Sequence, residues 1–161
     1  VLQMFADQGK DCIFIETVLD VDPLTRSHAL VECIPVSHSV ASKAPMYFKK
    51  AIDDATNDWS QHASKRCIET ESRNLQRKIP PNFPYVHIEF GLASGFVHVI
   101  DDIKEFDRLF ARRVLIGLMG LPEEHMHGRI STEGEGVQRQ WVHEFQKVYT
   151  TYDWVPQLHH S

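Results

Sequence analysis

The sequence predicts an α+β fold in which an antiparallel sheet, built from two β-hairpins, packs against flanking helices. Two observations support this prediction. The segments 11–19 and 28–36, and again 85–90 and 96–100, are short runs rich in β-branched and aromatic residues that flank turn-forming stretches, as the strands of hairpins do. Each pair is followed by a longer segment with apolar residues at helical spacing. A hairpin followed by a helix, twice, indicates an antiparallel sheet with helices beside it.

In the first half of the chain, helices are expected on both sides of the first hairpin. Residues 1–10 are typical of the end of an amphipathic helix, with Gly9 as its left-handed stop. Residues 37–45 are predicted to form a loop. Pro45 is then expected in the first turn of a helix that continues to Trp59, because the fixed φ of proline suits that position.

The second half begins with a polar connector. Residues 60–78 are polar and basic, with only weak helical spacing, and the three prolines within 79–84 exclude regular structure there. After the second hairpin, Asp101 or Asp102 is expected to cap a long helix over 103–121.

A last helix is expected at about 137–149, with its apolar residues on one side. From these periodicities the predicted core consists of Phe14, Val31, Phe90, Val99, Phe106, Phe110 and Trp141. The chain is accordingly divided into a first unit at 1–59, a polar and basic connector at 60–84 that ends in the proline-rich boundary, and a second unit at 85–161.

Composition narrows the class of protein. The chain has 161 residues, of which 42% are hydrophobic and 24% charged, and a net charge of −5; these values are ordinary for a globular domain and argue against a generally sticky nucleic-acid binder. No apolar run is long enough to span a membrane. The chain has three cysteines, Cys12, Cys33 and Cys67, and no C-x-x-C motif. An odd number without that motif indicates neither a disulfide framework nor a closed zinc site, so we expect buried thiols in a reducing compartment. His125 and His127 lack further ligands nearby, so no metal site is expected.

The strand at 28–36 carries the one pattern that points to chemistry. His28, Leu30 and Glu32 share a face, because alternate residues of a strand do. Three alternating histidines could place one imidazole beside a phosphorus atom as nucleophile while its neighbours manage protons. Here the middle position is leucine, which has no lone pair. No catalytic residue is therefore expected, and the chain is predicted not to hydrolyse dinucleotides or nucleotide phosphoramidates.

Several sequence segments, in the same order along the chain, resemble those of a known family. "GKDCIFIET", "SHALVECIPV" and "APMYFKKAI", followed by "IPPNFPYVHIEFGLASGFVHVIDD", "EFDRLFARRVLIGLMG" and "YTTYDW", make the chain similar to the CwfJ C-terminal family, the CWF-nineteen-like splicing factors. The resemblance implies that 1–59 is the C-terminal half of a histidine-triad-like domain, with an antiparallel sheet and flanking helices. It also implies that 85–161 is the second CwfJ C-terminal segment, an α+β extension packed on that domain.

The resemblance also implies a function. Such proteins associate with late spliceosomes and with the debranching of intron lariats. The chain is thus expected to be a nuclear, non-catalytic splicing module. Its implied partners are spliceosomal proteins, intron-lariat RNA or snRNA, and the lariat debranching enzyme; no membrane is among them. The upstream half of the triad-like domain normally carries a C-x-x-C and further histidines, so no cofactor is expected in this fragment and any zinc site would lie outside it.

Two kinds of candidate site residue remain. His28 could contact phosphate or ribose in a remnant pocket, or be a half-buried structural histidine. His87 and His98 could line a pocket if the register of the second hairpin allows it; the favoured alternative is that both are structural histidines with satisfied hydrogen bonds. The basic residues that could contact RNA phosphates are Lys49, Lys50, Lys65, Arg66, Arg73, Arg77, Lys78, Arg112 and Arg113. The richest stretch, 65–78, has turn and helix character, and a solvated charged face is the alternative explanation. Two rival functions stay open: a nucleotide hydrolase or transferase of histidine-triad type, and a pure protein–protein scaffold.

Overall fold

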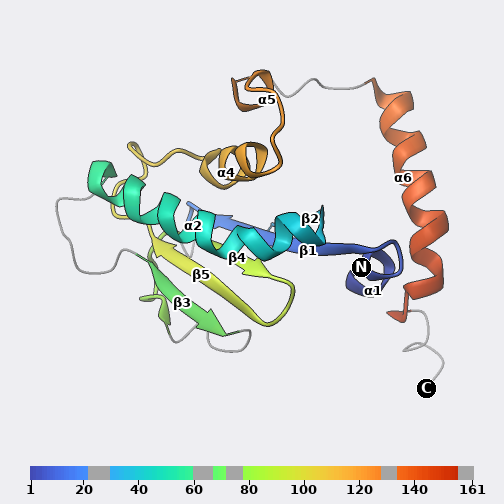
Figure 1. Cartoon of the computed structure of the whole chain (residues 1–161), viewed down its shortest axis with the longest axis horizontal. Coiled ribbons are helices and arrows are strands. Elements are labelled where there is room, and N and C mark those ends of the chain that lie inside the picture. Colours follow the sequence, from blue (N-terminus) through green and yellow to red (C-terminus); the bar gives the residue numbers. More distant parts are fainter. Residues whose placement is uncertain (22–29, 60–66, 72–77, 128–133, 156–161) are drawn as a thin grey trace.

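The structure is a computed structural model that describes residues 1–21, 30–59, 67–71, 78–127 and 134–155. Its elements, in chain order, are α1 (Leu2–Ala6), β1 (Lys10–Val18), β2 (Val31–Ser37), α2 (His38–Trp59), β3 (Ile68–Glu71), β4 (Tyr85–Phe90), β5 (Ser94–Val99), α4 (Phe110–Leu118), α5 (Glu124–His127), α6 (Glu135–Tyr149) and the 3-10 turn η1 (Thr150–Tyr152). Figure 1 shows α2 running across the sheet and α6 standing apart from it. The predicted α+β class is confirmed.

All five strands form one antiparallel sheet, in the order β2-β1-β4-β5-β3. Both predicted hairpins are present, with β1 paired to β2 and β4 paired to β5. Strand β1 also pairs with β4, so that Ile15 lies opposite Ile88. The first and second halves of the chain therefore share a sheet.

The core lies between one face of this sheet and helices α2 and α4. Phe48 and Ile52 of α2 are almost completely buried, as are Ile13 of β1 and Ile88 of β4. The ring of Phe48 packs on that of Phe90, with 5.9 Å between the ring centres. Phe110 and Leu115 of α4 belong to the same buried cluster, so the second hairpin and α4 share one core as predicted.

Two members of the predicted core are exposed. Val31 is 52% exposed because it opens the edge strand β2 and lies on the face away from α2 and α4. Trp141 is 55% exposed because none of the residues of α6 is buried. Both predictions are wrong. The others hold in part or in full: Val99, Phe106 and Phe110 are buried, and Phe14 and Phe90 are half-buried.

Two helix starts and one strand also differ from the predictions. Helix α2 begins at His38, so Pro45 lies inside it rather than in its first turn. Helix α4 begins at Phe110 instead of residue 103, because the carboxylate of Asp107 accepts the backbone N–H of Leu109 at 2.9 Å and holds a turn there. Strand β3 lies in the segment for which no strand was expected.

Candidate functional site

Of the three triad-like positions, the structure describes two, Leu30 and Glu32. Leu30 precedes β2 and is 71% exposed. Glu32 lies on the helix-covered face, where its carboxylate is 3.3 Å from the guanidinium of Arg112 on α4. His28 lies outside the described residues. The acidic third position thus ties the edge strand to α4, and both partners of the ion pair remain about half exposed.

The two strand histidines lie on opposite faces of the sheet. Val86 pairs with His98 and His87 pairs with Val97, so His98 points to the side of α2 and is buried, while His87 points the other way. The register therefore does not bring the two histidines into one pocket, which the sequence had left as one possibility beside structural roles. The sequence could not decide it, because a slip of one residue in register would have put both on the same face.

On the face away from α2, His87 is part of a hydrogen bond that crosses a strand. Its Nε2 lies 3.2 Å from the hydroxyl of Thr70 on β3, although β5 runs between β4 and β3. The crossing point is Gly95, where an added Cβ would lie only 3.0 Å from both of these atoms. Burial lowers the pKa of His87, which favours the neutral imidazole and a structural hydrogen bond.

The same face carries a second polar pair beside His87. Glu16 of β1 lies directly opposite His87 and is hydrogen-bonded to the hydroxyl of Tyr85. Burial, reinforced by the negative charge and hydrogen bond of Glu16, raises the pKa of Tyr85 to about 12. This phenol stays protonated at physiological pH. The described polar groups of this face therefore connect β1 to β4 and, across β5, β4 to β3.

Three of the basic residues proposed to contact RNA reach an edge strand of the sheet, and they do not all reach the same edge. Lys49 of α2 lies 2.9 Å from the carboxylate of Glu69 on β3, and Lys78 donates a hydrogen bond to the backbone carbonyl of Glu69. Arg112, in contrast, reaches β2, which is the opposite edge strand. Surface pairs of this kind contribute little stability, but they offset the positive charge.

Two further basic residues complete this group. Arg113 lies 2.8 Å from the carboxylate of Asp107, just before α4, and Lys50 of α2 is exposed. Lys65, Arg66, Arg73 and Arg77 lie outside the described residues. In the sequence they stand on both sides of β3, next to Lys78.

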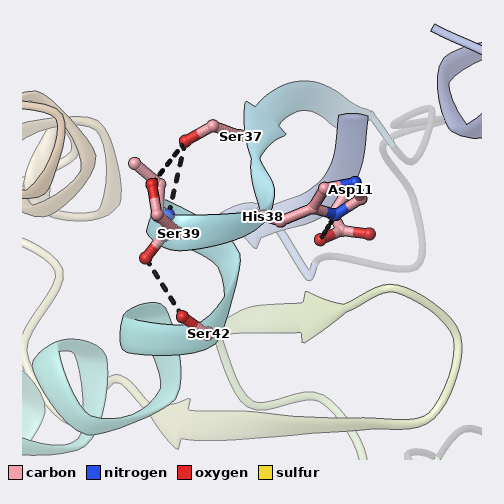
Figure 2. A network of polar contacts seen from close by, with 6 residues as sticks. Asp11, Ser37, His38, Ser39 and Ser42 are labelled. Carbon is pink, nitrogen blue, oxygen red and sulfur yellow. Dashed lines mark hydrogen bonds and ion pairs between the residues drawn. The ribbon is translucent and has the colours of Figure 1, made fainter. Parts of the chain in front are cut away.

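A polar network at the start of α2 was missed by the sequence analysis (Figure 2). The hydroxyl of Ser37 accepts the backbone N–H of Val40 at 3.4 Å and caps the helix, and Ser42 donates to the carbonyl of Ser39. Nδ1 of His38 lies 2.7 Å from Oδ2 of Asp11 on β1. Serine before an apolar run is a capping signal that could have placed this helix start, but no local signal joins Asp11 to a residue so far along the chain.

The His38–Asp11 pair forms part of the wall of an open cleft. The cleft has a volume of about 440 Å³ and lies between α1, β1 and α2. Its apolar lining includes Leu2, Ile13 and Ala41. The polar side chains of its lining are Gln3, Lys10, Asp11, His38 and Ser42, and the hydroxyl of Ser42 already donates to the carbonyl of Ser39.

The expectation of buried thiols holds fully for one cysteine and partly for the other two. Cys12 is buried and Cys33 and Cys67 are half-buried, and all three are free. Burial and the neighbouring Cys12 raise the pKa of Cys33 to about 12, and burial raises that of Cys67 to about 11. Among the described residues, no group of three or more metal-binding side chains converges, and no helix in that part of the chain has the length and apolar character needed to cross a membrane.

Comparison with known proteins accounts for the phrases found in the sequence. Family models described as "Protein similar to CwfJ C-terminal" and "Protein similar to CwfJ C-terminus 2" match residues 1–49 and 58–155. "CWF19-like protein 2 homolog" of Caenorhabditis elegans is 33% identical over 98% of this chain and 33% of its own length.

For "CWF19-like protein 2" of Homo sapiens the identity is 33%, over 95% of this chain and 17% of that protein. "Pre-mRNA-splicing factor cwf19" of Schizosaccharomyces pombe is 28% identical over 96% of this chain and 25% of its own length. The chain thus spans a third or less of the length of these relatives. Because the second model alone covers more than half of the residues and the first adds the N-terminal part, the chain belongs to the CwfJ C-terminal family.

Proposed function

We propose that this chain is a non-catalytic module of a nuclear pre-mRNA splicing factor. It acts in late, intron-lariat-containing spliceosomes, where it contacts RNA or splicing proteins and is linked to lariat debranching or complex disassembly. The observation that carries the proposal is the similarity over 96% of the chain to a relative named as a pre-mRNA splicing factor, within the family that both models identify.

The non-catalytic part of the proposal is supported by the triad-like strand. Leucine stands at the position where an attacking imidazole would be needed, and a hydrocarbon side chain cannot attack phosphorus. Glu32, the next position on that face, is engaged with Arg112.

For RNA contact, the edge of the sheet at β3 is the best-supported surface. Lys49 and Lys78 both lie against Glu69 there, and the sequence places Lys65 and Arg66 just before this strand. Lys78 contacts the backbone carbonyl of Glu69 rather than its carboxylate, and Asp53 also lies near Lys49. Phosphate oxygens would have to compete with these carboxylates for the ammonium groups. The alternative, a protein–protein scaffold, is favoured by the ion pairs that already engage three of the proposed basic residues, Lys49, Arg112 and Arg113.

A charge-replacement experiment tests the RNA part of the proposal. Lys65, Arg66, Arg73, Arg77 and Lys78 are replaced by Gln in the full-length protein. Association with purified lariat-containing complexes should weaken. The slope of the logarithm of the binding constant against the logarithm of the salt concentration should become shallower by about 0.7 for each phosphate contact that is lost. The melting temperature should not fall, because charges that serve RNA contact are not needed for folding.

The matched control removes the same number of charges elsewhere. It replaces the exposed residues Lys10, Lys104, Arg108, Arg139 and Lys147 by Gln, and association should be retained. Equal loss with both sets would mean a general charge effect. Association unchanged by the β3 set would refute the RNA contact and favour the scaffold.

A further inference from the structure

Helix α2 has a buried face and an outer face that is open to solvent. Ala44, Phe48 and Ile52 follow one another at intervals of four residues and are almost completely buried against the core. Figure 1 shows the helix lying across the sheet, with α4 along one side. The side chains on the outer face of α2 are those that point away from this core, and they are exposed.

An exposed aromatic ring lies between two lysines on the outer face. Lys43 comes four residues before Tyr47, and Lys50 comes three residues after it, so each lysine is one helical turn from the ring. Tyr47 is 47% exposed and the neighbouring Met46 is 66% exposed. The two lysines are exposed as well, and they stand two turns, or about 10 Å, apart along the helix axis.

These polar groups are not engaged within the protein. In the part of the chain that the structure describes, the side chains of Lys43, Tyr47 and Lys50 take part in no ion pair or hydrogen bond. A ligand that pairs with the two ammonium groups therefore does not have to displace a carboxylate first.

The carboxylates that pair with α2 from other elements meet a different side of the helix. Among the described residues, Asp11 pairs with His38 and Glu69 pairs with Lys49. His38 and Lys49 are eleven residues apart, which is close to three full turns, so they share one side of α2. That side is distinct from the outer face, since residue 49 is only one position from Lys50 and points about 100° away from it.

The acidic residues of α2 itself lie in its second half. Residues 38–52 contain three lysines and no aspartate or glutamate. The first acidic residue, Asp53, lies near Lys49, and Asp54 stands one turn after Lys50. The outer face around Tyr47 is therefore locally positive, although the chain as a whole has a net charge of −5.

We propose that the outer face of α2 binds single-stranded RNA, with one base stacked on the ring of Tyr47 and the phosphates on either side held by Lys43 and Lys50. Proteins bind single strands by combining cations that follow the backbone with aromatic rings on which bases stack. The inference deepens the RNA part of the splicing proposal and rests on it. It adds a stacking surface beside the β3 edge, which Lys49 reaches from the same helix.

A protein occupant matches this face less well. A partner helix docks through apolar anchors repeated over several turns, whereas the outer face offers two large apolar side chains, Met46 and Tyr47. A second copy of the chain would bring lysines against lysines, because residues 38–52 of both copies carry no acidic residue. Like charges placed opposite each other disfavour such a pair.

The test measures binding of fluorescein-labelled octauridylate to the whole chain by anisotropy, at low salt and without spliceosomes. Tyr47→Leu keeps an apolar side chain but removes the aromatic ring, and it should weaken binding about fivefold or more. Tyr47→Phe keeps the ring and should bind as tightly as the unmodified chain. This pair of variants separates base stacking from apolar packing.

Two charge variants test the phosphate contacts. Lys43→Gln with Lys50→Gln should weaken binding and make the slope of log affinity against log salt shallower by about 1.4, twice the change for one contact. The matched control, Lys104→Gln with Lys147→Gln, removes two exposed lysines outside α2 and should keep both affinity and slope. Unchanged urea midpoints will show that the variants fold.

Several results would overturn the proposal. Absence of octauridylate binding, or binding that Tyr47→Leu leaves unchanged, would do so. Fluorescein-labelled octaglutamate that binds as tightly and is lost in the same variants would make an acidic protein segment the occupant, and a dimer in sedimentation that Tyr47→Leu abolishes would make it a second copy. Octauridylate binding lost only with the β3 charge set would overturn this inference and leave the RNA part of the splicing proposal intact.

Discussion

Replacing Gly95 by alanine tests the hydrogen bond that crosses β5. The new methyl group would lie 2.4 Å from the backbone carbonyl of Ile88, and 3.0 Å from both His87 Nε2 and the Thr70 hydroxyl. The backbone contact is the severe one. Ile88 is held in the β4–β5 ladder, opposite Phe96, so it cannot move away without straining the pairing.

The expected magnitude follows from three terms. Overpacking of this kind costs about 1–3 kcal/mol, and a weakened His87–Thr70 hydrogen bond costs about 1 kcal/mol. Alanine also stiffens the unfolded chain, which offsets about 0.4–1 kcal/mol, and Gly95 does not have the positive φ that would add strain. The free energy of unfolding should therefore fall by about 2 kcal/mol.

Urea denaturation measures this loss, with Gly117→Ala as the matched control. Gly117 lies in α4, where an added methyl group would meet the side chain of Met126 at an ordinary 3.5 Å. That variant should gain up to about 1 kcal/mol, because alanine is the better helix former. If Gly95→Ala were as stable as the unmodified chain, the close packing of β4, β5 and β3 around Gly95 would be wrong.

Three further predictions can be checked with the same protein. Burial lowers the pKa of His87 below its usual 6.5, so the unfolded chain binds this proton more readily than the folded chain does. The free energy of unfolding should therefore fall as the pH drops below about 6.5. His87→Gln should reduce the difference in urea midpoint between pH 7.5 and 5.5, and an undiminished difference would argue against this role of His87. Phe110→Ala should cost about 3–5 kcal/mol, because Phe110 is buried in the core, whereas Trp141→Ala should leave the urea midpoint almost unchanged; similar losses for both would contradict the burial described. The purified chain should not hydrolyse dinucleotides or nucleotide phosphoramidates, and turnover that disappears on His28→Ala would refute the non-catalytic assignment.

The strands were predictable because their signal is local. Alternation and β-branched content placed β1, β2, β4 and β5 to within a few residues. The starts of α2 and α4 were not predictable in this way, because single side chains decide them. Ser37 caps α2, and Asp107 holds the turn before α4. The spacing of apolar residues in α6 was also recognised, but periodicity alone does not say whether Trp141 meets a core or solvent.

The candidate site depended more strongly on contacts between distant parts of the chain. His87 and His98 could be assigned to faces only once the β4–β5 register was known. Lys49 and Arg112 were both candidates for phosphate contact, and the sequence left open whether they share a face; their carboxylate partners lie on opposite edge strands. Such pairings join residues with no local relation in the sequence, so neither composition nor spacing could supply them.

The pairing of β1 with β4 has a consequence for synthesis of the protein on the ribosome. After β2 has emerged, it can pair with one edge of β1. The other edge of β1, which pairs with β4, stays unpaired while residues 38–90 are added. At about 5–20 residues per second this takes several seconds, during which an apolar strand with unpaired N–H and carbonyl groups is open to association with other chains. Because the two family models divide the chain between these strands, expressing either matched segment alone would make this temporary exposure permanent. Study of the protein therefore calls for both segments in one polypeptide.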